Sequence, residues 1–274
     1  MADFDLVAID ADGTTMDPSD RVRPRVRVAV RAVAASGVKL VLATGRALDG
    51  AQLVLDQLGL DAGLVLVNGA ILADSLNQPP FERAMLPAAE AQAAVTALQT
   101  AGVEPFVYDD PDCSEDIVML AAQPTMPQFM ANQAARHRRR DLLSWLDHPV
   151  LTIVAAGPQE PMTQAAATLT AQLDGRAEVE CSYFQSGGMW LLTVVAPGCN
   201  KADGLERLAA RHGIAMDRVL AVADGHNDIE MVRRVGWGVA MGNAIPAVKA
   251  VADEIVADNQ HDGLAEALER HFAL

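Results

Sequence analysis

The sequence has few cysteines, few aromatic residues and no long apolar run. Its three cysteines are an odd number at wide spacings, so they indicate neither a disulfide framework nor a zinc site. Aromatic residues make up only 4% of the chain, which argues against base stacking as the basis of its function. No apolar run approaches the ~20 residues of a membrane-spanning helix, and the N-terminus lacks the pattern of a secretory signal. We therefore expect a cytoplasmic protein that does not bind membranes.

Positive charge is also scarce. The 274 residues include 36 acidic and 21 basic side chains, which gives a formal net charge of −15. This excess opposes nonspecific attraction to nucleic acid, so no nucleic-acid partner is expected. A hydrophobic content of 51% is typical of a folded globular chain, and the length fits one large domain or two smaller ones. The sequence leaves the oligomeric state open.

Strands alternate with helices at both ends of the chain, which predicts a parallel sheet covered on both faces. The middle of the chain is different, because several of its expected strands follow one another without a helix between them. A helix is also expected there over about 126–146. We predict a Rossmann-like, doubly wound α/β core made of residues 1–80 and 192–274. An α+β cap domain with an antiparallel sheet would be inserted over 81–191.

Polar side chains follow four of the expected core strands, at the point where each strand ends. They are Asp10, Asp12, Thr44, Arg46, Asn68, Asp224, Asn227 and Asp228. Ligands of open α/β sheets bind at the carboxyl ends of the strands, so these residues predict one shared site. Single acids there would be interpreted as turn formers or helix caps. Four carboxylates together would repel one another without a cation, and oxygen ligands favour Mg²⁺ beside a phosphate substrate.

Five short segments occur in order along the chain. They are Asp10–Thr14, Ala43–Arg46, Asn200–Lys201, Asp224–Met231 and Val239–Ala244. In this order they resemble the motifs of the haloacid dehalogenase superfamily of phosphohydrolases. The fifth segment and the later Asn259–Gly263 are similar to the Cof-type subfamily, whose cap is inserted between the second and third motifs.

The resemblance implies a Mg²⁺-dependent phosphatase of small phosphorylated metabolites, such as sugar phosphates, nucleotides or pyridoxal phosphate. Asp10 would attack phosphorus and form an aspartyl-phosphate, and Asp12 would act as general acid and then base. Thr44 would hydrogen-bond a phosphoryl oxygen, and Lys201 would offset the charge of the acids. The metal would be held by Asp10, Asp12 (through its backbone carbonyl), Asp224 and Asp228. Substrate contacts are expected from Gly45, Arg46, Asn68, Asn227 and Asn243.

Four positions depart from the family pattern. Thr15 stands where Leu is usual, Ala223 where Gly is usual, and Asn200 and Ala202 flank the lysine in place of Ser and Gly. A positive φ at Ala223 would strain the loop that carries the metal ligand. These departures leave a non-catalytic sensor of sugar phosphates or nucleotides as an alternative. A phosphotransferase or phosphomutase, which passes the phosphoryl group to an alcohol, is a further alternative.

Simpler interpretations also remain open for three of the proposed site residues. Lys201 could be a solvated lysine that opens a helix, although a cation there opposes the helix dipole. Thr44 could be a helix N-cap, a role compatible with phosphate binding. Arg46 could be an ordinary surface arginine.

Overall fold

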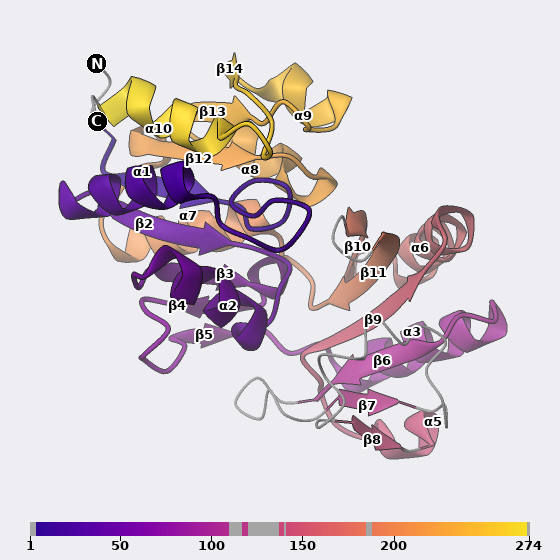
Figure 1. Cartoon of the computed structure of the whole chain (residues 1–274). Helices are drawn as coiled ribbons and strands as arrows, with labels where there is room; N and C mark the ends of the chain where they lie inside the picture. Colours follow the sequence, from indigo (N-terminus) through magenta and orange to yellow (C-terminus); the bar gives the residue numbers. More distant parts are fainter. Residues whose placement is uncertain (1–3, 110–116, 120–136, 140, 185–187, 273–274) are drawn as a thin grey trace. The chain divides into compact units, whose positions relative to one another are not determined.

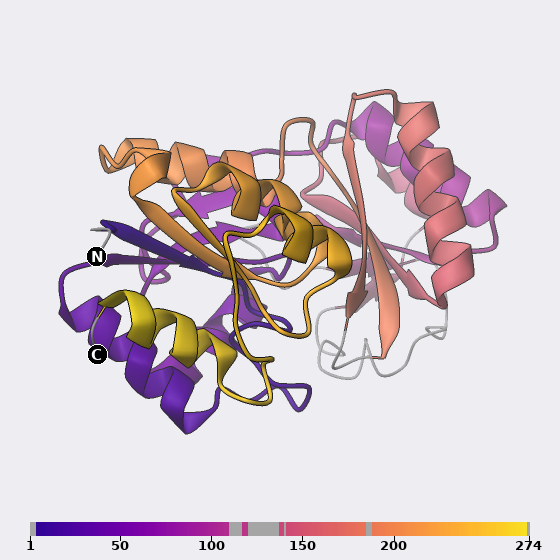
Figure 2. The same ribbon diagram turned by 90° about the horizontal axis from the view of Figure 1, so that it is seen from above.

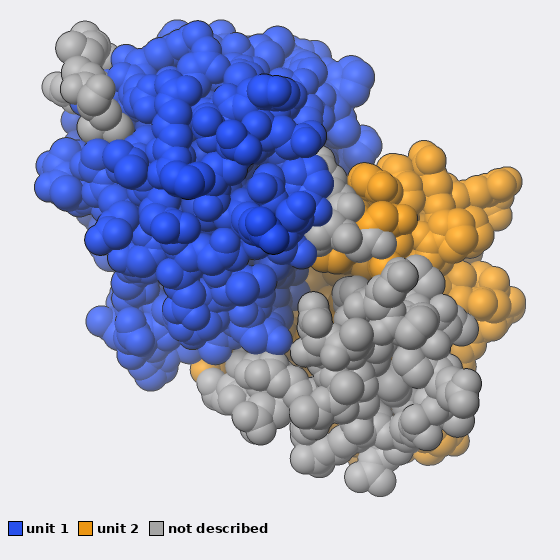
Figure 3. Space-filling view, in the orientation of Figure 1, with its two compact units in different colours: residues 1–82, 200–274 blue, residues 83–199 orange. Residues whose placement is uncertain are grey.

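The computed structural model describes residues 4–109, 117–119, 137–139, 141–184 and 188–272. The chain divides into two compact units, which Figure 3 shows in different colours. Unit 1 comprises residues 1–82 and 200–274, and unit 2 comprises residues 83–199. The sequence predicts that the inserted domain ends at residue 191, whereas unit 2 ends at residue 199. The difference arises because strand β11 (Met189–Val195) continues through position 191. This strand pairs with two strands of unit 2 along most of its length.

Unit 1 is built around a mostly parallel sheet of eight strands, in the order β14-β13-β12-β1-β2-β3-β4-β5 (Figure 1). The six strands from β14 to β3 run parallel, and β4 is antiparallel to β3. The strands are β1 (Leu6–Ile9), β2 (Lys39–Ala43), β3 (Gly63–Leu66), β4 (Ile71–Ala73), β5 (Glu82–Arg83), β12 (Val219–Ala223), β13 (Trp237–Ala240) and β14 (Glu254–Ile255). Because β1 lies between β2 and β12, segments from both ends of the chain form one sheet. The predicted α/β core is confirmed.

Helices cover both faces of this sheet, as Figure 2 shows. The helices are α1 (Pro24–Ala35), α2 (Leu48–Leu58), α7 (Lys201–Arg211), α8 (Ile229–Arg234), α9 (Pro246–Val251) and α10 (Gly263–Phe272). Helices α1 and α10 pack side by side on one face, and α7 packs against α8 on the other. In the part of the chain that the structure describes, no helix is long and apolar enough to cross a membrane.

Helix α1 shows why these segments fold as they do. Pro24 stands at its first position, where the fixed φ of proline suits a helix and no hydrogen bond is lost. The buried residues are Val26, Ala29, Val30 and Val33, at spacings of three and four, so one face of the helix is apolar. Burial of this face against α10 and the sheet stabilises the helix.

Unit 2 contains a second sheet of six strands, in the order β10-β11-β9-β6-β7-β8. The pairs are antiparallel except for β7 and β8, which run parallel. Its other elements are β6 (Pro105–Tyr108), β7 (Ile117–Met119), β8 (His137–Arg139), β9 (Thr152–Gly157), β10 (Glu178–Phe184), α3 (Ala88–Thr100), α5 (Leu142–Trp145) and α6 (Gln159–Leu173). Buried side chains of α3, α6 and the sheet form one apolar core. The predicted α+β insert with a largely antiparallel sheet is confirmed.

The helix expected over about 126–146 is wrong where the structure describes this segment. Residues 137–139 form β8, which pairs with β7, and only 142–145 are helical. Residues 126–136 and 140 lie outside the described residues. Hydrogen bonding to a strand distant in sequence overrides the local helical pattern here.

Two valines on α1 test whether its buried face stabilises unit 1. Val30 is fully buried, whereas Val28 is 69% exposed on the same helix. Val30→Ala is expected to lower the free energy of unfolding by roughly 2 kcal/mol, because two methyl groups leave a packed site. Val28→Ala makes the same change in helix propensity, and its free energy of unfolding should stay within about 0.5 kcal/mol of the wild-type value. Urea denaturation measures both, and equal effects would contradict the packing described here.

Candidate active site

Lys201, the first residue of α7, bridges two carboxylates at the carboxyl edge of the unit 1 sheet. Its Nζ donates hydrogen bonds to Asp10 Oδ1 at 2.6 Å and to Asp228 Oδ1 at 2.7 Å. Asp10 directly follows β1, and Asp228 lies in the short helix η4 (His226–Asp228) after β12. The Lys201 side chain is only 1% exposed, so the interpretation as a solvated lysine is wrong.

A third carboxylate, that of Asp224, is held beside this bridge at the end of β12. Its Oδ1 accepts a hydrogen bond from Thr14 Oγ1 and its Oδ2 from Asn243 Nδ2, both at 3.0 Å. Asn243 Nδ2 also donates to the carbonyl of Gly13 at 2.8 Å. The structure therefore places Asn243 as a group that orients Asp224.

Asp10, Asp224 and Asp228 can together hold a metal ion. Each is buried and offers one carboxylate oxygen, and these three oxygens lie within 4.8 Å of one another. Three carboxylates beside a single ammonium group leave the cluster negative. Oxygen donors of this kind suit a hard divalent cation, so the residues present fit the expected metal.

The electrostatics of the cluster show how costly its negative charge is. Burial raises the pKa of the Asp10 carboxyl to about 7, with Asp228 and Asp12 adding to the rise and Lys201 opposing it. Burial, together with Asp10 and Asp228, raises the pKa of Asp224 well above its ordinary value. Burial lowers the pKa of Lys201, but the two carboxylates that it bridges outweigh this and raise it above its usual range. Lys201 thus stays charged, while Asp10 and Asp224 favour a proton or a cation.

The carboxylate of Asp12 is not one of these three and pairs with Arg46. Arg46 Nε and Nη2 donate to its two oxygens at 2.9 and 2.6 Å, and Nη2 also donates to Asp20 Oδ1 at 2.9 Å. Burial lowers the pKa of Arg46, but the bonds to both carboxylates raise it overall. The Arg46 side chain is only 14% exposed, so the surface-arginine interpretation is wrong. Three of the four expected acids thus form the carboxylate cluster, and Arg46 balances the charge of the fourth.

Thr44, Asn68 and Asn227 form the neighbouring part of the site. Thr44 is fully buried, and its Oγ1 accepts a hydrogen bond from the backbone N–H of Arg46 at 3.1 Å. The N-cap of α2 is Ala47, so Thr44 is not a helix cap. Asn227 Nδ2 donates to Asn68 Oδ1 at 2.9 Å.

Gly45 lies beside this pair of asparagines, and its backbone is exposed. A Cβ at position 45 would lie 3.2 Å from Asn68 Oδ1 and 3.8 Å from Asn227 Nδ2. The absence of a side chain at Gly45 therefore leaves room next to the two amides.

The four departures from the family pattern fit the site without strain. Thr15 Oγ1 donates to the backbone carbonyl of Asp10 at 2.5 Å, which fixes the turn after β1. Ala223 ends β12 in regular pairing with β13 and does not have a positive φ, so the expected strain does not occur. Asn200 caps α7 by accepting a hydrogen bond from a backbone N–H of its first turn, and Ala202 is buried.

Two residues with roles here had no assignment in the sequence analysis. Thr14 holds Asp224, and its place inside the first motif is a signal that could have identified it. Asp20 has no comparable signal, because it reaches Arg46 only through the path of the loop between β1 and α1.

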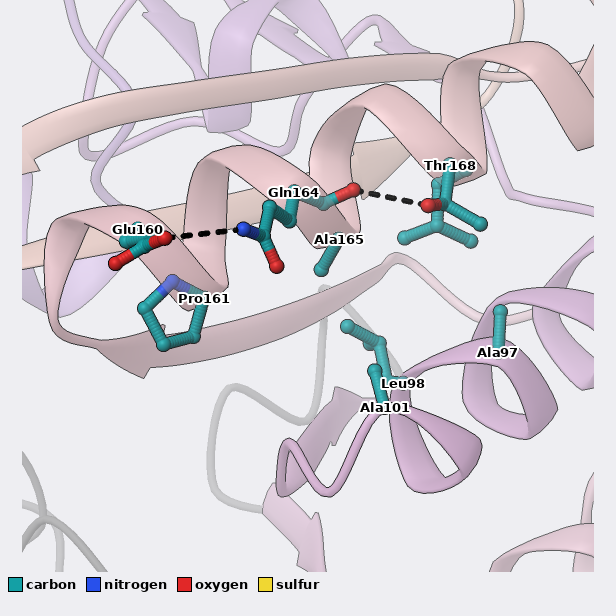
Figure 4. Close-up of a pocket in the computed structure, with 9 residues that line it drawn as sticks. Ala97, Leu98, Ala101, Glu160, Pro161, Gln164, Ala165 and Thr168 are labelled. Atoms are coloured by element: carbon teal, nitrogen blue, oxygen red, sulfur yellow. Dashed lines mark hydrogen bonds between the residues drawn. The ribbon is translucent and has the colours of Figure 1, made fainter.

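A pocket of about 340 Å³ in unit 2 is a different kind of feature (Figure 4). It lies between α3 and α6 and is lined by Ala97, Leu98, Ala101, Glu160, Pro161, Gln164, Ala165, Thr168 and Leu169. Its lining has one carboxylate and no cation, so it lacks the groups that phosphate chemistry needs.

Comparisons with known proteins agree with the site. The family model of haloacid dehalogenase-like hydrolases matches residues 7–268. The 5-amino-6-(5-phospho-D-ribitylamino)uracil phosphatase YcsE of Bacillus subtilis is 29% identical, over 99% of this chain and 97% of its own. The HMP-PP phosphatase of Serratia proteamaculans is 27% identical, over 92% of this chain and 89% of its own. A solved haloacid dehalogenase-like hydrolase from Bacteroides thetaiotaomicron superposes with a TM-score of 0.81 at 27% identity, covering 98% of this chain and all of that one.

The family match extends over almost the whole chain and includes both parts of unit 1. It agrees with the order of the five sequence motifs and with the doubly wound sheet that carries them. The chain therefore belongs to the haloacid dehalogenase-like hydrolases.

Proposed function

We propose that this protein is a Mg²⁺-dependent phosphatase that hydrolyses small phosphate monoesters through an aspartyl-phosphate on Asp10. The observation that carries the proposal is the buried bridge from Asp10 through Lys201 to Asp228, with the carboxylate of Asp224 beside it. Two similar proteins, from Bacillus subtilis and Serratia proteamaculans, are named as phosphatases of phosphorylated compounds, which supports this substrate class.

Asp10 is the nucleophile in this mechanism. Its carboxylate attacks phosphorus, so that an oxygen–phosphorus bond forms on Asp10 while the bond to the leaving alcohol breaks. Asp10, Asp224 and Asp228 would hold Mg²⁺, with the backbone carbonyl of Asp12 as a further oxygen ligand. The bound cation supplies charge neutralisation between the carboxylates and the phosphoryl group. Lys201 keeps the attacking carboxylate in place through its 2.6 Å hydrogen bond.

Asp12 transfers the protons. In its protonated form it gives one to the leaving oxygen, and as a carboxylate it then takes one from the water that hydrolyses the aspartyl-phosphate, which restores the protonated form. The Thr44 hydroxyl already accepts a hydrogen bond from the Arg46 backbone, and its own proton is directed to a phosphoryl oxygen. Gly45, Asn68 and Asn227 contact the substrate next to the phosphoryl group.

Substrate choice is assigned to unit 2 acting as the cap domain. All predicted catalytic and metal-binding residues belong to unit 1, and they act on the phosphoryl group that all phosphate monoesters share. Discrimination among sugar phosphates, nucleotides and pyridoxal phosphate then needs residues from elsewhere. The contacts of Thr15, Asn200 and Ala223 favour the enzyme over the non-catalytic sensor, since no departure displaces a catalytic side chain.

Asp10→Asn tests the nucleophile. An amide does not attack phosphorus, so we expect turnover of a phosphate monoester to fall at least ~1000-fold. The pKa of Asp10 in the folded protein lies above its ordinary value, so the negative charge of Asp10 destabilises the fold at pH 8. Because Asp10→Asn removes this charge, its melting temperature should not drop by more than a few degrees. Asp217→Asn removes the same charge at an exposed position before β12 and should keep full activity. Undiminished hydrolysis by Asp10→Asn would refute the assignment.

The raised pKa of Asp10 predicts pH-dependent metal binding. With a folded pKa of about 7, the carboxyl is mostly protonated at pH 6 and mostly ionised at pH 8. Because a metal competes with this proton and with that of Asp224, Mg²⁺ should bind at least about tenfold more weakly at pH 6 than at pH 8. Isothermal titration calorimetry in buffers of different ionisation enthalpy measures the affinity and the released protons. Equal affinities at the two pH values, with the fold intact at both, would contradict the metal site.

Gly13→Ala tests the placement of Asp224. Gly13 has a φ of +79°, and a Cβ there would lie 2.2 Å from Asp224 Oδ2. The side chain is fixed by Thr14 and Asn243, so the added methyl should displace it and weaken Mg²⁺ binding at least ~10-fold. Gly37→Ala is the matched control, because its φ is +90° and no atom lies within 4 Å of the added Cβ. Gly37→Ala should lose roughly 1 kcal/mol of stability through its backbone strain alone and keep its metal affinity, whereas Gly13→Ala should lose more stability and also lose metal affinity.

A further inference from the structure

The hydrogen bonds between Arg46 and Asp12 engage both oxygens of the residue to which the proposed function assigns proton transfer. These two bonds hold the carboxylate toward Arg46, and release of one of them frees Asp12 to turn toward the leaving group. We propose that Asp20 is a positioning residue that retains Arg46 while Asp12 turns toward the leaving oxygen. This inference rests on the proposed function and adds a role for a residue outside the five motifs.

Asp20 accepts from the same nitrogen that holds Asp12. Arg46 Nη2 lies 2.6 Å from Asp12 Oδ1 and 2.9 Å from Asp20 Oδ1. The guanidinium can keep its bond to Asp20 when Asp12 moves, so a largely buried charge does not lose all carboxylate contact. Loss of Asp20 removes a carboxylate that shares Nη2 of Arg46 with Asp12, which tightens the hold of Arg46 on Asp12.

The loop that carries Asp20 is shaped to present this side chain. Asp20 has a φ of +55°, in the left-handed region that non-glycine residues seldom adopt. Its N–H donates to the carbonyl of Asp17 at 3.0 Å, and its carbonyl accepts from Gln57 Nε2 at 3.0 Å. Gln57 Oε1 in turn accepts from the N–H of Val22 at 2.9 Å, so α2 holds the loop at Asp20 and at Val22.

Gly50 makes room for the stem of Arg46. A Cβ at this position in the first turn of α2 would lie 2.8 Å from Cβ and 3.0 Å from Cδ of Arg46. Glycine is unfavourable within a helix, but here it lets the arginine stem lie close against the helix backbone. Helix α2 therefore leaves space for the aliphatic part of Arg46, while Asp20 binds its guanidinium group.

Leaving-group dependence tests the role of Asp20. Hydrolysis of an alkyl ester such as glycerol phosphate needs a proton on the leaving oxygen, whereas 4-nitrophenolate departs with little help. Asp20→Asn should lower kcat/KM for the alkyl ester at least ~10-fold and for 4-nitrophenyl phosphate less than ~3-fold. Asp20→Glu should recover most of the alkyl-ester activity. Asp56→Asn, which removes an exposed carboxylate from the same α2, should match the wild type on both esters.

Equal losses on the two esters, or an alkyl-ester activity unchanged in Asp20→Asn, would overturn the inference. An alkyl-ester loss carried by KM alone would also overturn it, because it would place Asp20 in substrate binding. Exchange of the Arg46 Nε–H with water, measured by nuclear magnetic resonance, tests the pairing without turnover. This exchange should be at least threefold slower in Asp20→Asn, where Asp12 holds Nε more tightly, and an unchanged rate would count against the inference. If the wild type hydrolyses neither of the two esters, the result would instead count against the proposed function.

Discussion

The ammonium group of Lys201, buried between Asp10 and Asp228, is the contact on which the rest of the site depends. It joins the end of β1 to α7 and to the turn after β12, which are segments from both ends of the chain. Removal of the ammonium would leave two buried carboxylates facing each other without a cation between them, an arrangement that strongly destabilises a folded protein. The same contact fixes the carboxylate of Asp10, the proposed nucleophile, so the packing of the two chain ends in unit 1 also orders the proposed site.

The four acids of the site differ in their partners, and this difference separates their roles. Asp10 and Asp228 share an ammonium group, Asp224 is held by a hydroxyl and an amide, and Asp12 pairs with a guanidinium. The first three remain close enough to bind one cation, while the charge of Asp12 is balanced by Arg46. A site with both a metal and a proton-transfer group needs such a separation, since a carboxylate bound directly to the metal would not be available to carry protons.

Most of unit 1 could be predicted because its signals are local. The buried strands, the proline at the start of α1 and the polar residues after each strand are visible in short stretches of sequence. The Arg46–Asp12 pair was not predicted, because it depends on side-chain rotation and on the space left by Gly50. Strand β8 and the boundary after β11 were missed for a related reason: pairing between strands distant in sequence decides both. The role of Asp20 was missed as well, because the position of its side chain depends on a left-handed backbone conformation in a loop.

The central claim is that Asp10 becomes phosphorylated, and the most direct measurement is mass spectrometry of protein quenched in acid during turnover with Mg²⁺. We expect one phosphoryl group on the peptide that contains Asp10, assigned to Asp10 by fragmentation. Omission of Mg²⁺ or substitution by Asp10→Asn should abolish it. A phosphoryl group on another residue, or hydrolysis that proceeds with no phosphorylated protein at any time point, would contradict the claim.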